Sequence, residues 1–150
     1  MTALPLDIGA ATAGAEARPV RIGTTWDVVR ITARLGIDAL DRLRAIEAPV
    51  GPVLHTPLRS AVEFLVAPGE APSWPHLRGT RAVSTGVLLY PPPHVTVASH
   101  GRSTDARRWI VAPADPLTLT DADALCEAVT TAIAADAIAT LAPAGRRRTS

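Results

Sequence analysis

Residues 51–68, GPVLHTPLRSAVEFLVAP, constrain the fold more than any other part of the chain. Two apolar runs, at residues 53–54 and 62–66, flank a turn-forming segment at residues 56–59. Proline and small residues bracket the whole unit, which is the pattern of two short strands joined by a tight connection. The sequence therefore predicts a β-hairpin here, and the other elements can be placed against it.

The segment before the hairpin has a strand pattern followed by a helix pattern. Residues 25–32 are rich in β-branched side chains, which favours a strand with Trp26, Val28 and Arg30 on one face. Residues 33–47 carry apolar side chains at helical intervals, which predicts an amphipathic helix. The apolar positions of this helix are Ile37, Leu40, Leu43 and Ile46. Residues 1–19 are small and weakly patterned, so we expect a flexible arm.

After the hairpin, the sequence predicts a loop at residues 69–81 and strands at 84–90, 94–99 and 108–111. A long helix follows, with Thr120 as the expected N-cap and Leu125, Val129 and Ile133 in its apolar stripe. Asp121 and Asp123 then fall in the first turn, where the helix dipole favours acids, so we interpret them as capping residues rather than a metal-binding pair. Residues 143–145 should end the helix, which leaves a basic flexible tail at 144–150.

Composition narrows the function classes. Hydrophobic residues make up 47% of the 150-residue chain, and the formal net charge of +1 gives no electrostatic case for tight nucleic-acid binding. The longest stretch without acidic or basic residues, between Arg81 and Arg102, contains three successive prolines, which rule out a membrane helix there. The N-terminus lacks the basic start of a signal peptide. We therefore expect a soluble, cytoplasmic protein with no membrane association.

The common chemical motifs are absent from the sequence. The four histidines, His55, His76, His94 and His100, lack the spacing of a metal site. The single cysteine, Cys126, excludes an internal disulfide and is interpreted as a buried small hydrophobe. No nucleophile elbow surrounds any serine. An enzyme that uses unrecognised residues would have to start from Asp27, Glu63 and His100.

A series of short motifs between residues 22 and 113 carries a family resemblance. They are residues 27–32 followed by a helix, residues 51–53, residues 56–57 through 67–68, residues 77–79, residues 86–92, and Trp109 with Pro113. In order and spacing they resemble the catalytic module of the bifunctional DNA primase/polymerase family, an archaeo-eukaryotic-primase-like domain of plasmids, phages and actinobacterial chromosomes. The family's N-terminal portion is missing, so the chain would correspond to the latter part of that domain.

The resemblance implies both a fold and a loss of chemistry. Members of this family hold two divalent ions, Mg or Mn, with an Asp-x-Asp pair, and those positions fall at about Arg30 and Thr32 here. The family's histidine in the return strand falls at Val62, and its acidic residue before the Arg-Gly pair falls at His76. Because an arginine repels Mg²⁺, the resemblance implies a degenerate, non-catalytic relative that uses no cofactor.

We expect one α/β (α+β) domain over residues 20–143, with a mostly antiparallel sheet of about five strands and two packed helices. Four arginines near the former site are candidates for contacts with phosphates of DNA or a nucleotide, or else ordinary surface groups. They are Arg30, Arg59, Arg78 and Arg81. The competing function is a protein-interaction or regulatory domain in which an exposed Trp74 and the proline-rich loops meet a protein partner. The sequence gives no prediction of the oligomeric state.

Overall fold

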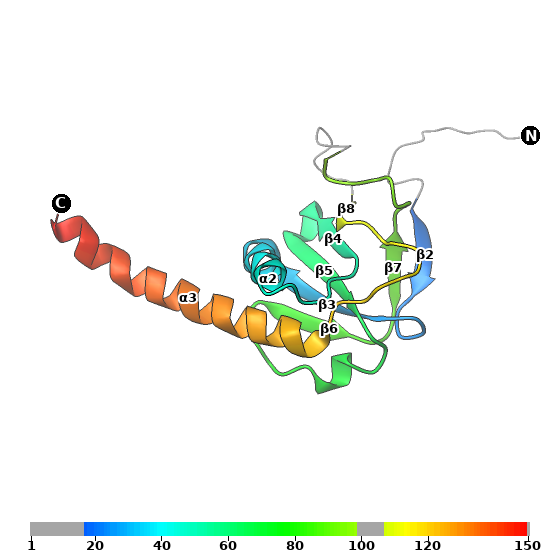
Figure 1. The fold of residues 1–150 in the computed structure, drawn as a ribbon, viewed down its shortest axis with the longest axis horizontal. Coiled ribbons are helices and arrows are strands. Elements are labelled where there is room, and N and C mark those ends of the chain that lie inside the picture. The colour runs from blue at the N-terminus through cyan, green and yellow to red at the C-terminus, as the bar shows by residue number, and fades with distance from the viewer. Residues whose placement is uncertain (1–16, 99–106, 150) are drawn as a thin grey trace, which may run out of the picture.

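The computed structural model describes residues 17–98 and 107–149, with residues 142–149 described by their backbone alone. A five-stranded antiparallel sheet of order β6-β3-β5-β4-β8 forms its centre (Figure 1). These strands are β3 (Asp27–Thr32), β4 (Val53–Thr56), β5 (Ala61–Val66), β6 (Thr80–Val83) and β8 (Arg108–Val111). A second antiparallel sheet pairs β2 (Arg18–Arg21) with β7 (Val87–Tyr90). The helices are α2 (Ala33–Ala45) and α3 (Ala122–Thr149).

These elements confirm the predicted α+β class. The hairpin at residues 51–68 is also confirmed, since β4 and β5 pair antiparallel and the 3-10 helix η1 (Pro57–Arg59) joins them. A second 3-10 helix, η2 (Ala71–Ser73), follows β5. The predicted strand before the hairpin and the predicted amphipathic helix correspond to β3 and α2.

Alternation of side chains along β3 and β5 gives the central sheet two apolar faces. On one face, Val29, Ile31 and Phe64 pack in a single cluster with residues of α2 and α3. On the other face, Val28 and Leu65 pack with a cluster that includes residues beside and within the two-stranded sheet. The domain therefore has three layers, with the helices on one side of the central sheet and β2–β7 on the other (Figure 1).

Helix α2 lies directly on β5 because one of its residues has no side chain. A Cβ atom at Gly36 would collide with Cγ2 of Val62, which is itself fully buried. Glycine is an unfavourable residue inside a helix, by about 1 kcal/mol relative to alanine. This local cost permits the close approach between helix and sheet.

The strand predictions after the hairpin were partly wrong. The predicted strand at 84–90 forms only in its second half, as β7, which pairs with β2. The predicted loop at 69–81 instead ends in β6, which pairs with β3. Gly86, with a φ of 102°, lies between β6 and β7 and lets the chain turn out of the central sheet. The partner strand β2 includes Arg18 and Pro19, which had been assigned to the flexible arm.

The expected strand at 94–99 does not form over its described residues, 94–98, and residue 99 lies outside the described part of the chain. The segment makes one parallel bridge to β8, between Thr96 and Trp109, with hydrogen bonds from the Val97 N–H to the Trp109 carbonyl and from the Trp109 N–H to the Val95 carbonyl. The side-chain expectations for two helical positions were also wrong. Ile37 and Ile46 are 44% and 66% exposed, and Ile46 lies just past the end of α2. Cys126 is half-buried rather than buried.

The start of α3 differs from the prediction in its capping residue. Asp121 Oδ2 accepts a hydrogen bond from the Ala124 N–H at 2.9 Å, so Asp121 is the cap, as its interpretation as a capping residue required. Thr120 instead accepts a hydrogen bond from the Gly51 N–H at 2.9 Å, which ties the helix start to the hairpin.

The end of α3 also differs, because the helix continues to Thr149 and includes the segment expected to be a flexible tail. Pro143 and Gly145 therefore lie within the helix, although both residues are unfavourable in a helix interior. The stretch Ala122–Leu141 is long and apolar enough to cross a membrane, with a mean hydropathy of 1.5, although a core helix of a soluble protein meets the same criterion.

Candidate functional site

Glu63 lies in the middle of β5, and its side chain is fully buried. The strand register places Arg30 of β3 directly opposite, on the sheet face away from the helices. Arg30 Nε donates to Glu63 Oε2 at 2.9 Å, and Arg30 Nη2 lies 2.8 Å from the same oxygen. A buried carboxylate requires such a partner, because an unpaired charge in the interior is strongly destabilising.

A second arginine reaches the same carboxylate from the segment before β8. Arg107 Nη1 lies 3.5 Å from Glu63 Oε1. The side chains of Arg30 and Arg107 are 23% and 27% exposed, so both guanidinium groups are held by Glu63 and still reach solvent. Glu63 therefore fixes the direction of two positive groups at the surface of the sheet.

Two further arginines extend this positive surface. The pKa of Arg107 lies below its ordinary value, mainly because the guanidinium group is partly buried. The negative charge of Glu63 raises this pKa, and the positive charges of Arg59 and Arg30 lower it. Arg59 is thus an electrostatic neighbour of Arg107, while Arg81 lies opposite Arg30 on β6. We call Arg30, Arg59, Arg81 and Arg107 the arginine cluster. Two of its four positive groups, Arg30 and Arg107, pair with the single carboxylate of Glu63, so the cluster has an excess of positive charge.

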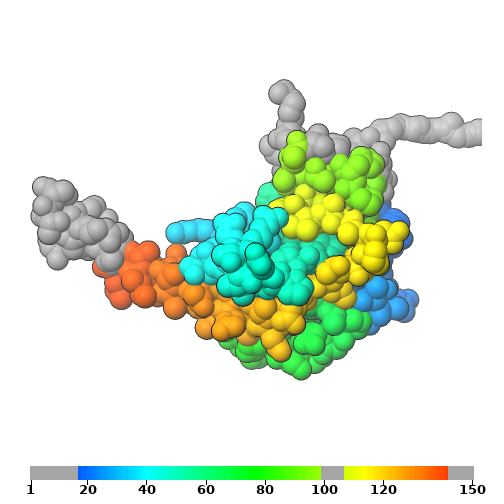
Figure 2. Space-filling view, viewed as in Figure 1, coloured from blue at the N-terminus to red at the C-terminus, as the bar shows by residue number. Residues whose placement is uncertain are grey.

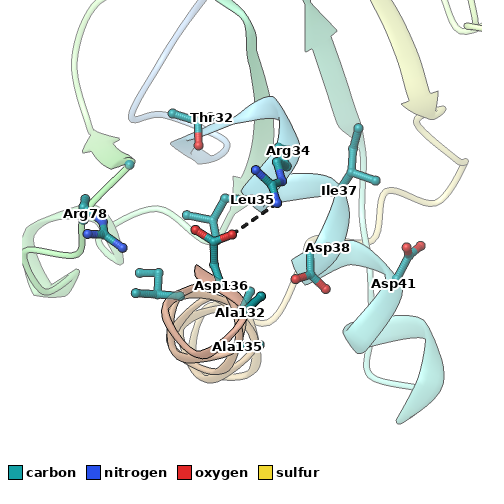
Figure 3. A pocket seen from close by; sticks show the side chains of 13 residues that line it. Thr32, Arg34, Leu35, Ile37, Asp38, Asp41, Arg78, Ala132, Ala135 and Asp136 are labelled. Atoms are coloured by element: carbon teal, nitrogen blue, oxygen red, sulfur yellow. Dashed lines mark ion pairs between the residues drawn. The ribbon is translucent and has the colours of Figure 1, made fainter. Parts of the chain in front are cut away.

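The structure brings together three of the four arginines that the sequence nominated. Arg30, Arg59 and Arg81 belong to the arginine cluster, whereas Arg78 lines a different cavity, beside α2 and α3 (Figure 3). Sequence reasoning missed Arg107, which lies outside every strand pattern. The residue that could have predicted this site is Glu63, because an acid inside an apolar strand requires a positively charged partner on a neighbouring segment.

Asp27, one of the residues considered for an enzyme, has a structural contact. It is fully buried, and its Oδ2 accepts hydrogen bonds from the Gly69 N–H at 2.9 Å and the Ala71 N–H at 3.0 Å. These bonds fix the loop between β5 and η2. Glu63 is held by two arginines, and His100 lies outside the described residues, so the described part of the chain brings no catalytic group together from this set.

His55 and Arg108 face each other across β4 and β8, on the side of the sheet that the helices cover. Burial, and then the charge of Arg108, lowers the pKa of His55. Arg108 is 7% exposed, and its Nε and Nη2 make no hydrogen bond. His76 is exposed in the loop before β6. His55 and His76 therefore lie in different parts of the fold.

Trp74 is not the exposed residue that the protein-interaction hypothesis assumed. Its ring is half-buried against the core cluster under the helices, and its Nε1 donates to Thr80 Oγ1 at 3.0 Å. The tryptophan therefore anchors the loop before β6.

The residues at the arginine cluster do not fit the divalent ions that the family resemblance implies. Arg30 occupies the position expected for the first carboxylate, and both oxygens of the adjacent Glu63 face guanidinium groups. Among the described residues, no three His, Cys, Asp or Glu side chains are placed to hold a metal ion. The positive groups of the cluster therefore repel Mg²⁺ and Mn²⁺.

Comparison of the chain with protein-family models, with curated proteins and with solved structures gives no match. The resemblance to the primase/polymerase family therefore stays a prediction from the sequence motifs.

Proposed function

We propose that this chain is a degenerate primase/polymerase-like domain that binds nucleic acid or a nucleotide without catalysing its synthesis. The arginine cluster around Glu63 is the observation that carries the proposal. It lies on the sheet face away from the helices, and two of its members, Arg30 and Arg107, are oriented by a buried carboxylate. Guanidinium groups match the geometry of phosphate oxygens and form charge-assisted hydrogen bonds with them.

Within this site, Arg59 and Arg81 are the groups free to make new contacts. Both are exposed, and neither side chain forms an ion pair or hydrogen bond with another described residue. Arg30 and Arg107 already share Glu63, so a phosphate would compete with that carboxylate or use their remaining N–H groups. We assign the first contacts with phosphate to Arg59 and Arg81, with Arg30 and Arg107 supplying the charge behind them.

Fluorescence anisotropy with labelled single-stranded and duplex oligonucleotides tests the proposal, with a nucleoside triphosphate as competitor. We expect saturable binding that weakens as the salt concentration rises, because phosphate contacts release counterions. Arg59→Gln and Arg81→Gln should each weaken binding without unfolding the protein. Arg44→Gln, which removes an exposed arginine from α2 on the opposite side of the sheet, is the matched control. Wild-type protein that fails to bind at low salt contradicts the proposal.

The alternative is a protein-interaction or regulatory domain with no role in nucleic-acid binding. Apolar side chains at the surface favour it, since Leu58, Val87 and Leu89 are 80%, 62% and 44% exposed. An interface of this kind buries apolar surface, so its affinity should change little with salt. This alternative would be favoured if the chain bound a partner protein in a complex that persists at high salt and bound no oligonucleotide.

A further inference from the structure

Helix α3 extends well beyond the body of the domain. Its first half packs beside α2, and past the positions of Asp136 and Ala139, which still lie beside α2, the helix extends away from the rest of the chain (Figure 1). Figure 2 shows the part of α3 up to residue 141 extending beyond the body of the domain. The buried residues of the helix are Ala122, Leu125, Ala128, Val129 and Ala132. Beyond Ala132, none of the side chains described up to Leu141 is buried. The 28-residue helix is about 42 Å long, so a large part of it has no place in the core.

The part of α3 at residues 130–141, where the helix leaves the body of the domain, is too apolar to be a typical solvated helix. Residues 130–141 include a single charged residue, Asp136, whose Oδ1 lies 3.3 Å from Nη2 of Arg34. Ile138 and Leu141 are 66% and 80% exposed, and only 22% of the most apolar stretch is buried. A helix that is apolar around its circumference is normally buried against a partner. This part of α3 therefore presents surface that a partner would cover.

A cavity of about 680 Å³ opens where α3 leaves α2 (Figure 3). Its apolar lining includes Leu35, Ile37 and Ile133, and its rim carries charges of both signs. Ala135 and Ala139 of α3 also line it, so its apolar floor is continuous with residues 130–141 of the helix. Each molecule thus has both an unpaired apolar helix and an apolar groove beside the same helix.

We propose that a second copy of this chain covers this surface, with the two α3 helices paired antiparallel about a twofold axis. A twofold interface uses the same patch on both subunits, and here each copy supplies one projecting helix and one groove. The alanines along α3 allow the two helices to approach closely. This inference does not rest on the proposed binding of nucleic acid.

Charge favours the antiparallel direction. The sequence places Arg146, Arg147 and Arg148 in the last turns of α3. In an antiparallel pair these turns lie beside the partner's first turns, whose acidic residues are Asp121, Asp123 and Glu127, and near the groove with Asp38 and Asp41. In this arrangement the two helix dipoles also point in opposite directions, so the positive end of each helix lies beside the negative end of the other. A parallel pair would bring the three arginines of both copies together.

Sedimentation equilibrium of the full chain over a range of concentrations tests the proposal. We expect wild-type protein to dimerise and Leu141→Glu to raise the dimer dissociation constant at least about tenfold, because a charge would enter the apolar interface. Leu58→Glu is the matched control, since both leucines are 80% exposed and Leu58 lies in η1. It should dimerise like wild type. Circular dichroism checks that each variant keeps its helix content.

Replacing the three terminal arginines with glutamate supplies a second variant, which should weaken the dimer through repulsion from the partner's acids. Wild-type protein that stays monomeric at every concentration overturns the proposal, as does Leu141→Glu protein that dimerises as tightly as Leu58→Glu protein. Monomeric protein that sediments with phosphatidylcholine vesicles would also overturn it, and would assign the helix to a lipid surface.

Discussion

One buried carboxylate, Glu63, holds two arginines at the centre of the sheet, and this couples stability to the candidate site. Replacing it with glutamine should destabilise the fold by about 3 kcal/mol, because Arg30 and Arg107 would stay largely buried without a counter-charge. Urea unfolding measures the loss. Glu47→Gln is the control, since Glu47 is exposed just past α2, and the same chemical change there should alter the stability by less than about 0.5 kcal/mol. Equal stabilities for the two variants would contradict the assigned role of Glu63.

His55 gives the fold a pH dependence of known sign. Its pKa in the folded protein lies below 6.5, through burial and the charge of Arg108, so the unfolded chain binds the proton more readily. The stabilising contribution is complete above pH 6.5 and is lost as the pH falls through the folded-state pKa. His55→Gln should therefore flatten the fall in stability between about pH 7 and pH 5. Urea midpoints across that range test this, and parallel curves for the two proteins would contradict it.

At the scale of elements, the contact between α2 and β5 depends on Gly36. Gly36→Ala would raise the helix propensity of α2, yet the added methyl group would collide with Val62. Overpacking of this kind costs about 1–3 kcal/mol, so we expect a net loss of stability despite the better helix former. Thermal unfolding measures the change. A more stable Gly36→Ala protein would show that the helix can move away from the sheet at little cost.

Sequence reasoning predicted the elements whose signal is local and missed those set by distant contacts. The hairpin, the strand at residues 27–32 and helix α2 each carry a regular pattern. The bounds of β6 and β7 do not, because β6 is set by its pairing with β3 and β7 by its pairing with β2, which begins in the segment expected to be flexible. The end of α3 was misplaced because Pro143 and Gly145 favour a stop, whereas the helix continues through both residues to Thr149.

The candidate site likewise combines residues that the sequence pattern indicated with residues brought together only by distant contacts. Arg30 and Glu63 lie 33 positions apart, and only the register of β3 on β5 makes them partners. Arg107 joins them from a segment with no pattern of its own. Arg78 is near Arg81 in sequence, yet the loop before β6 carries it toward the helices. Proximity in the chain was therefore a poor guide to which arginines act together.

At the scale of the whole molecule, the proposed self-association surface and the proposed phosphate-binding surface lie on opposite sides of the central sheet. The helices cover one face, and α3 continues past it as the proposed surface for a second copy. The opposite face carries the arginine cluster beyond the part that packs against the two-stranded sheet. Because the two surfaces lie on opposite sides, we expect Leu141→Glu to weaken self-association and to leave oligonucleotide binding per chain intact.

The dependence of oligonucleotide affinity on salt shows whether the arginine cluster binds phosphate. For wild-type protein and single-stranded DNA, we expect a negative slope of log affinity against log salt concentration. Arg59→Gln and Arg81→Gln should each reduce its magnitude by about 0.7, the change for one lost phosphate contact on a single strand. Arg44→Gln should keep the wild-type slope. Absent binding at low salt, or the same slope for all four proteins, would contradict the assignment of the arginine cluster as the phosphate-binding site.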